Sequence, residues 1–311
     1  MLYRSQAAGG RSLILALLAV AAAFWLLSAL LYYASAAALA HSSFRFSRIA
    51  AGDIHVDVLV AGNSRARDLL AGSAAGASPG HSPSVFNLAY NGLSREDTIE
   101  WIETFFRQGN TANTILIETS ALYSDREFCD SKPYWAVYPQ LRAAQRADCP
   151  KDARSARYFP LTVFNSEQYL RALYYFAWNR HGDQDWGDDY AIPQQLCARL
   201  PLANIFAFQK EALRLDVASV GREIAELKAW LASHGYRTRV VFVLAPFLAA
   251  PGALAAIADM DRTDARLLGS EGNLSLSTAL GGDCRDFADS EHIGPLGRRK
   301  VQALIFRELG Y

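Results

Sequence analysis

The chain contains 311 residues, 51% of them hydrophobic and 20% charged, with 31 basic and 31 acidic side chains. Such a composition can bury a full core, which excludes a disordered, collagen-like or coiled-coil protein, and the balanced charge gives no indication of nucleic-acid binding. The motifs GxxxxGKS/T, CxxC and HExxH do not occur in the sequence, which argues against a P-loop NTPase, a zinc ribbon and a zincin protease.

The N-terminal region contains a long uncharged segment, residues 12–40. A membrane span needs about 20 apolar residues, whereas the core of a signal peptide needs only about 7–15. Residues 1–40 are therefore expected to form a short stub and a transmembrane anchor. The tripeptide at 38–40, Ala-Leu-Ala, also resembles a signal-peptidase site, so cleavage after residue 40 remains an alternative, and a buried core helix is another.

Two arginines, Arg4 and Arg11, precede this segment, and basic residues favour the cytoplasmic side of a span. The N-terminus is therefore expected in the cytoplasm and the rest of the chain on the other side. No later segment is long and apolar enough to cross a membrane. The sequence predicts a single-pass protein of the inner (cytoplasmic) membrane of a Gram-negative-type cell, with a periplasmic or extracellular domain.

A linker over 41–53 is expected to precede a domain over 54–311 in which strands alternate with helices. Such alternation predicts an α/β fold with a parallel sheet and helices on both faces, a three-layer α/β/α arrangement. An aromatic-rich stretch at about 123–215 interrupts the alternation and is expected to be a mostly helical insertion. The expected strands are 54–61, 85–88, 114–118 and 239–244, and the expected helices are 65–70, 95–107, 220–234 and 301–309.

The chain has four cysteines: Cys129, Cys149, Cys197 and Cys284. An even number in an exported domain permits disulfides. Of the possible pairings, Cys129–Cys149 is the most local. Free buried thiols are the alternative.

The first candidate for chemistry is the segment Gly62-Asn63-Ser64, which follows the first expected strand and opens a helix. A Ser hydroxyl there would lie at the carboxyl edge of the sheet, where doubly wound folds bind ligands. Backbone N–H groups at the start of the helix could bind a developing oxyanion. The alternative is that Ser64 only caps the helix.

The second candidate is Asp289-Ser290-Glu291-His292, just before the last expected helix. A neutral imidazole can take the Ser64 proton and return it, and Asp289, three residues earlier, can hold the other ring nitrogen. The alternative is a solvated loop histidine. The six histidines show no metal-ligand spacing, so no metal or other cofactor is expected.

The third candidate is the turn from Asn87 to Gly92, after the second expected strand. Gly92 could present a backbone N–H to an oxyanion, and Asn91 could add a side-chain donor. The alternative is an ordinary strand-to-helix turn, which Asn-Gly favours.

Together, these residues resemble the SGNH/GDSL hydrolase superfamily. Its nucleophile follows strand one in a G-D/N-S block, a Gly after strand two supplies an oxyanion donor, and a DxxH block precedes the final helix. The corresponding residues here are Ser64, Gly92, Asp289 and His292. The resemblance covers about 54–120 and 236–311, and it implies a flavodoxin-like (SGNH hydrolase) fold.

The sequence departs from that family after the third expected strand, where the family has an Asn in a GxND-like block. Here the residues are Glu118-Thr119-Ser120. Ser120, Asn63 or Asn91 could take the role of third oxyanion donor, or the hole could have two donors. Removal of one such donor can cost about 10²–10³ in rate.

The stretch at 242–246, Phe-Val-Leu-Ala-Pro, resembles the membrane-anchored branch of the superfamily. That branch includes the alginate O-acetylation proteins and the D-alanyl transfer protein of teichoic acid synthesis. The resemblance implies an O-acyltransferase, with acetyl as the expected group. Its partners would be an envelope polysaccharide acceptor and a membrane-bound O-acyltransferase that delivers the donor. An esterase of the same fold, or a non-catalytic glycan-binding or scaffold protein, are the alternatives.

Overall fold

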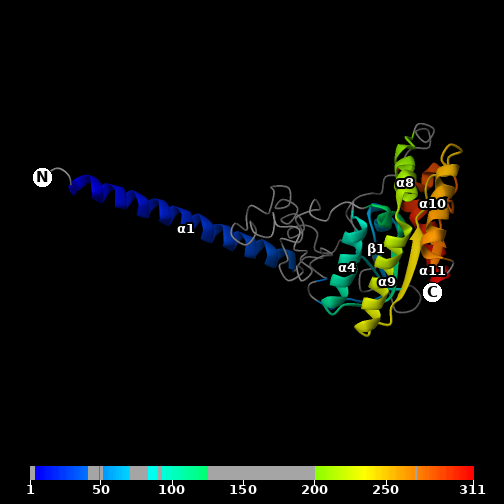
Figure 1. Cartoon of the computed structure of the whole chain (residues 1–311), viewed down its shortest axis with the longest axis horizontal. Coiled ribbons are helices and arrows are strands. Elements are labelled where there is room, and N and C mark those ends of the chain that lie inside the picture. Colours follow the sequence, from blue (N-terminus) through cyan, green and yellow to red (C-terminus); the bar gives the residue numbers. More distant parts are fainter. Residues whose placement is uncertain are drawn as a thin grey trace. The chain divides into compact units, whose positions relative to one another are not determined.

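The computed structural model describes residues 4–40, 49, 52–70, 83–89, 93–124, 200–269 and 272–311. The chain divides into two compact units, each of which is described by itself. The described part of the first unit is one helix, α1 (Arg4–Ala40). All other described residues belong to the second unit, an α/β domain (Figure 1).

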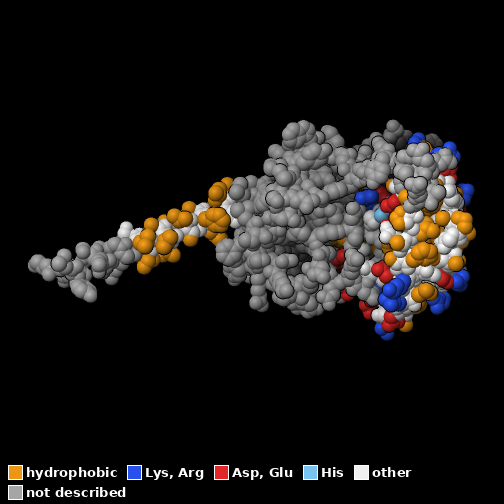
Figure 2. Space-filling model, turned by 90° about the horizontal axis from the view of Figure 1, so that it is seen from above, with side chains coloured by type: hydrophobic (Ala, Val, Ile, Leu, Met, Phe, Trp, Pro, Cys, Tyr) orange, Lys and Arg blue, Asp and Glu red, His pale blue; other side chains and the backbone are white. Residues whose placement is uncertain are grey.

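Helix α1 is long and apolar enough, over Ser12–Leu30, to cross a membrane. Its described side chains, residues 12–30, are almost all exposed, and Figure 2 shows hydrophobic groups along this stretch. An N-terminal helix of this kind can be an anchor or a signal sequence. The expected apolar helix is therefore present. The structure shows that it is long and apolar enough for a membrane span.

The α/β domain is built on a five-stranded sheet in which every neighbouring pair of strands is parallel. The strand order is β2-β1-β3-β4-β5, the 2-1-3-4-5 order of flavodoxin-like doubly wound sheets. In such sheets the carboxyl edge between β1 and β3, where the winding reverses, is the usual ligand site. The strands are β1 (His55–Ala61), β2 (Val85–Asn87), β3 (Thr111–Glu118), β4 (Arg239–Leu244) and β5 (Asn273–Ser275).

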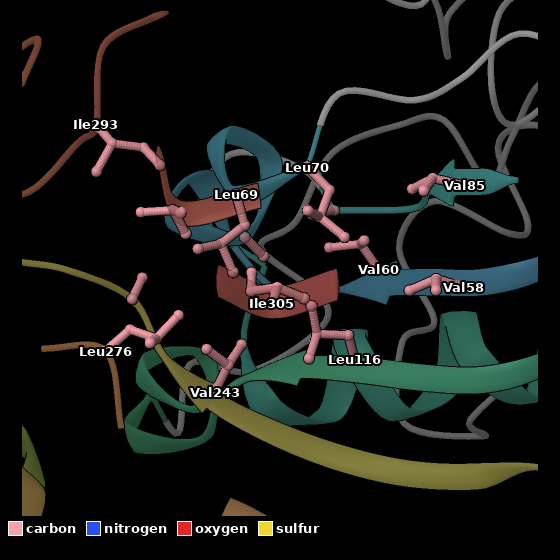
Figure 3. Packing of buried hydrophobic residues seen from close by; sticks show 14 of the residues in the cluster. Val58, Val60, Leu69, Leu70, Val85, Leu116, Val243, Leu276, Ile293 and Ile305 are labelled. Carbon is pink, nitrogen blue, oxygen red and sulfur yellow. The ribbon is translucent and has the colours of Figure 1, made fainter. Parts of the chain in front are cut away.

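Two helices, α3 (Ser64–Leu69) and α11 (Pro295–Leu309), cover one face of this sheet. Alternate residues of the strands point to this face, because side chains alternate along a strand. The resulting cluster joins Val60 and Leu116 of the sheet with Leu69 and Ile305 of the helices (Figure 3). Each of these four side chains is fully buried.

Helices α4 (Arg95–Arg107) and α9 (Val217–Ser233) cover the opposite face. The ring centroids of Phe86 in β2 and Phe105 in α4 lie 5.8 Å apart, and Lys228 of α9 lies over the ring of Phe242 in β4. Beside them, α8 (Ala203–Arg214) and α10 (Leu254–Leu268) share a second buried cluster with the end of β4. The sheet thus has helices on both faces, as predicted.

Most predicted elements outside the insertion are confirmed, with small shifts. Strand 239–244 is β4 with the same bounds, and the helix predicted at 95–107 is α4, where Ser94 and Asp97 form a reciprocal capping box. Helix α9 begins three residues earlier than predicted, because Asp216 caps it. Helix α11 begins at Pro295 rather than 301, since proline fits the first turn of a helix. Helix α10 and strand β5 were not predicted.

The insertion at about 123–215 lies mostly outside the described residues, and within it the structure describes α8. Cys129, Cys149 and Cys197 also lie outside them, as does the predicted Cys129–Cys149 pair. Cys284 is disulfide-bonded. The alternative of a free thiol is therefore wrong for Cys284.

Candidate active site

The turn after β1 presents Ser64 at the carboxyl edge of the sheet. Asn63 caps α3, since its Oδ1 accepts a hydrogen bond from the Arg65 N–H at 3.0 Å, and Ser64 is the first helical residue. The alternative that Ser64 caps the helix is therefore wrong. Because Asn63 performs the capping, the Ser64 hydroxyl is available for another partner.

Gly62 makes this turn possible. Its φ of 138° lies in a region that L side chains rarely adopt. A Cβ at this position would lie 2.8 Å from the Cβ of Ala66 and 3.2 Å from that of Glu118. The turn therefore requires glycine both for its backbone angle and for the close approach of α3 to β3.

The loop before α11 carries the other two predicted catalytic residues. Asp289 Oδ1 accepts hydrogen bonds from the backbone N–H groups of Glu291 and His292, at 2.9 and 2.8 Å. A bridge between Phe287 and Ile293 closes the loop at its base. These contacts hold the Asp289 carboxylate in place beside the His292 ring.

The structure brings Ser64, His292 and Asp289 into one hydrogen-bonded chain. Ser64 Oγ and His292 Nε2 lie 2.8 Å apart, although 228 positions separate them in the sequence. His292 Nδ1 and Asp289 Oδ2 lie 2.7 Å apart. The His292 side chain is 21% exposed and that of Asp289 is 46% exposed. This is the geometry of a nucleophile, a base and a group that orients the base, open to solvent.

The environment makes His292 a stronger base than a free imidazole. Burial lowers the pKa of His292, but the hydrogen bond and charge of Asp289 outweigh burial, helped by the charges of Glu291 and Asp68, so that the pKa rises above 6.5. Burial raises the pKa of Asp289, but hydrogen bonds from His292 and from two backbone N–H groups lower it below 3.8 overall. Asp289 is therefore an anion at neutral pH.

The predicted oxyanion donors have different outcomes. Asn63 Nδ2 donates to Ser120 Oγ at 3.0 Å, and Ser120 in turn donates its only proton to Glu118. Ser120, as placed, therefore supports Asn63 and directs its proton to Glu118 rather than to a substrate. Asn91 and Gly92 lie outside the described residues. Asn63 keeps its second amide hydrogen.

Several residues at the site were not predicted. Glu291 lies beside His292, with its Oε1 4.0 Å from Nδ1, and accepts a hydrogen bond from Asn204 of α8 at 2.6 Å. Arg65, directly after Ser64, is 1% exposed and faces Glu118. The only signal in the sequence was the position of these charged residues next to the predicted site.

Among the described residues, Asp289, Glu291 and His292 form one group whose ligand atoms lie within 4.8 Å of one another. A metal there would have to displace the hydrogen bond between His292 and Asp289. The arrangement therefore favours a proton-transfer pair over a metal site.

A second buried polar cluster lies beside the end of β3. Asp264 of α10 accepts hydrogen bonds from the hydroxyls of Thr119 and Tyr123, each at 2.6 Å. Burial raises the pKa of Asp264 to about 7, and the two hydroxyls offset only part of that effect. The carboxyl group is therefore protonated in the folded chain at pH values where it is ionised in the unfolded chain.

This pKa predicts that stability falls with increasing pH. The folded state holds the Asp264 proton up to about pH 7, whereas the unfolded state releases it near 3.8. Between these values the folded state binds more protons, so Asp264 should lower the free energy of unfolding by on the order of 4 kcal/mol as the pH rises from 4 to 7. Asp264→Asn should remove this contribution.

The measurement is urea unfolding of the wild type and Asp264→Asn at pH 5 and pH 8, followed by tryptophan fluorescence. The variant should gain stability relative to the wild type at pH 8 and much less at pH 5. Other titrating groups cancel in this comparison. An equal difference at both pH values would contradict the assignment.

The chain matches no protein-family model, no curated protein and no solved structure. A function therefore has to be argued from the chemistry of the described residues.

Proposed function

We propose that the chain is a membrane-anchored, SGNH-type O-acyltransferase that acts through an acyl-enzyme on Ser64. The observation that carries this proposal is the 2.8 Å contact between Ser64 Oγ and His292 Nε2, together with the 2.7 Å contact between His292 Nδ1 and Asp289 Oδ2. A Ser that is freed from capping, paired with a base and backed by an oriented carboxylate is the general form of an activated hydroxyl nucleophile.

In the first step Ser64 Oγ attacks the acyl carbon, and its proton moves to His292 Nε2. The bond to the leaving oxygen then breaks, and that oxygen takes the proton from His292. In the second step an acceptor hydroxyl gives its proton to His292 and attacks the acyl carbon, which restores Ser64. Throughout, Asp289 stabilises the imidazolium and holds the ring.

The tetrahedral intermediate needs donors for its oxyanion. The backbone N–H of Ser64 is one candidate, because the first N–H groups of a helix have no acceptor within that helix. The second amide hydrogen of Asn63 is another. Gly92, as in the resemblance, is the third, and its role remains a prediction because it lies outside the described residues.

The location of the site supports the proposal. Ala61 of β1 pairs with Ile117 of β3, so the turn with Ser64 and the turn with Ser120 leave the sheet side by side. This is the edge between β1 and β3 where a sheet of order 2-1-3-4-5 binds its ligands. The strand order, the nucleophile after β1 and the DxxH block before α11 together support an SGNH-type domain.

Helix α1 supports the anchoring part of the proposal. We place its N-terminus in the cytoplasm, because Arg4 and Arg11 precede the apolar stretch, and the α/β domain in the periplasm. The bonded state of Cys284 fits an oxidising compartment. In this arrangement a membrane-bound O-acyltransferase could supply the acyl group, and an envelope polysaccharide could accept it.

Transfer and hydrolysis share the acyl-enzyme and differ in what attacks it. The test is to give the full chain in detergent an acetyl donor together with oligosaccharides from several envelope polymers. Mass spectrometry then compares acetylated oligosaccharide with released acetate, and Ser64→Ala is the control. A suitable acceptor should take most of the acetyl groups and raise turnover. Rapid deacetylation of an acetylated glycan, with transfer to none, would indicate an esterase instead.

The second candidate is a non-catalytic glycan-binding or scaffold protein of the same fold. The observation in its favour is that Ser120 gives its proton to Glu118, so it is not free to serve as an oxyanion donor. A fluorophosphonate probe distinguishes the two functions, because it labels only an activated serine. Stoichiometric labelling of the wild type at Ser64 would exclude the non-catalytic function.

A further inference from the structure

A buried ion pair lies directly behind the candidate nucleophile. Arg65 of α3 is 1% exposed and Glu118 at the end of β3 is fully buried, and Arg65 Nε lies 3.5 Å from Glu118 Oε1. A buried pair gains little net stability, because removing both charges from water costs about as much as their attraction returns. Within the described residues, neither Nε nor Nη1 of Arg65 has a hydrogen-bond partner, so Nε contacts Glu118 by charge alone and this pair is not optimised for stability.

The ion pair is part of a closed series of contacts that includes both neighbours of Ser64. Ser120 Oγ donates a hydrogen bond to Glu118, and Asn63 Nδ2 donates one to Ser120 Oγ. Asn63 Oδ1 accepts a hydrogen bond from the backbone N–H of Arg65, which completes the series. Ser64 therefore sits between two residues, Asn63 and Arg65, that are both held to the end of β3.

The same arginine also reaches the segment that follows β4. Arg65 Nη2 donates to the carbonyl oxygens of Ala245 and, at 3.3 Å, Pro246. Its guanidinium carbon lies 3.3 Å from the ring centroid of Phe247. Glu118 Oε1 accepts a hydrogen bond from the Ala245 N–H at 3.3 Å. Both members of the pair are thus attached to residues 245–247.

That segment continues into a contact with the loop of the candidate base. The N–H of Leu248 donates to the carbonyl of Ser290 at 3.1 Å, and Ser290 stands between Asp289 and His292. A short path of direct contacts therefore leads from Ser64 through Arg65 and residues 245–248 to His292. Each contact on this path is buried or part-buried.

We infer that Arg65 and Glu118 are positioning residues that fix Ser64 Oγ relative to His292 Nε2. This inference rests on the proposed function, since it assigns a role in the reactivity of Ser64. Neither side chain touches the reacting atoms. Their effect is to hold the nucleophile and its base, which come from distant parts of the sequence, at reacting distance, where a displacement of about 1 Å can cost about 100-fold in rate.

The test uses the full chain in detergent and a fluorophosphonate probe in excess. The amplitude of labelling reports the fraction of folded protein, and the rate constant reports the reactivity of Ser64. The double variant Arg65→Met/Glu118→Gln removes both charges, which is often neutral for stability. We expect full amplitude with a rate constant about 100-fold below that of the wild type. A purely structural pair would instead lower the amplitude and leave the rate constant unchanged.

The matched control is Arg107→Met/Glu103→Gln, an ion pair in the last turns of α4. Helix α4 runs antiparallel to the strands, so this pair lies at the edge of the sheet opposite Ser64. Its removal should leave the rate constant at the wild-type value. An equal loss in both double variants would overturn the inference.

A second variant covers the case in which the first does not fold. Arg65→Lys keeps a charge beside Glu118 but loses the planar fork that reaches Ala245 and Pro246. Its rate constant should fall at least about 10-fold, and a wild-type rate constant in either folded variant would overturn the inference. If the wild type itself is not labelled, or Ser64→Ala is labelled equally, the proposed function fails instead.

Discussion

Replacement of Ser64 by alanine is expected to lower ester turnover by about 10⁴-fold or more. The substitution removes the oxygen that lies 2.8 Å from His292 Nε2. It should change the free energy of unfolding by no more than about 1 kcal/mol, because it removes one part-buried hydrogen bond and leaves the cap of α3, Asn63, in place. Hydrolysis of p-nitrophenyl acetate and urea unfolding measure the two effects.

His292→Ala should cause a comparable loss, and the double variant Ser64→Ala/His292→Ala should be little worse than either single variant. The two residues act as one unit, so their effects should not add. Ser233→Ala is a matched control, since this exposed serine at the end of α9 donates to the Trp230 carbonyl and contacts the neighbouring His234 Nδ1, and neither partner belongs to the candidate site. Turnover of Ser64→Ala at the wild-type rate, or additive losses in the double variant, would contradict the proposed pairing.

The fold could be predicted where the local pattern is strong. After Arg239, strand β4 is a run of valine, phenylalanine and leucine that is closed by Pro246, and the start of α4 has the reciprocal cap of Ser94 and Asp97. Strand β5 has only three residues, and its parallel pairing with β4 defines it, so no local signal exists. Helix α10 carries five charged residues from Asp259 onward, and its apolar face packs against α8 rather than the sheet centre.

The residues that carry the chemistry of the site could be predicted from the sequence, but the buried contacts that hold them in place could not. Ser64 and His292 stand next to recognisable turns, and the parallel register of β1 with β3 places the first of these at the carboxyl edge. The buried Arg65 could not be predicted, because an arginine in a short helix normally faces solvent. Its partners come from distant parts of the chain: Glu118 is the last residue of β3, and the carbonyl of Ala245 follows the end of β4. Only the three-dimensional structure brings them together.

Ser120 illustrates the same limit. In the sequence it stands where a third oxyanion donor would be needed, and a serine has the right chemistry. Its single proton is taken by Glu118, two residues earlier, so its role is decided by a neighbour whose burial the sequence does not reveal. A substitution to alanine at this position should therefore act through Asn63, which would lose its Nδ2 partner.

The second large effect is expected for Asp289→Asn, which keeps the shape of the side chain and removes its charge. The loss in kcat/KM should be about 10²–10⁴-fold, because the imidazolium that forms in the transition state loses its counter-charge and the ring loses its preferred tautomer. Asn can still accept the backbone hydrogen bonds that Asp289 Oδ1 receives from Glu291 and His292. The loop should therefore remain folded.

This variant should also move the pH profile in a defined direction. In the wild type, kcat/KM should rise with pH and level off above an inflection that lies higher than 6.5, since Asp289 raises the pKa of His292 and only the neutral ring accepts the Ser64 proton. Without that charge, burial lowers the pKa of His292, so the inflection should move to lower pH even as the rate falls. The measurement is the hydrolysis of a small acetyl ester between pH 5 and pH 9.

Asp283→Asn is the control, because this aspartate pairs with Arg285 rather than with His292. The substitution should leave both the rate and the inflection unchanged. An inflection that stays in place in Asp289→Asn would show that another group titrates, and His292 would then not be the base.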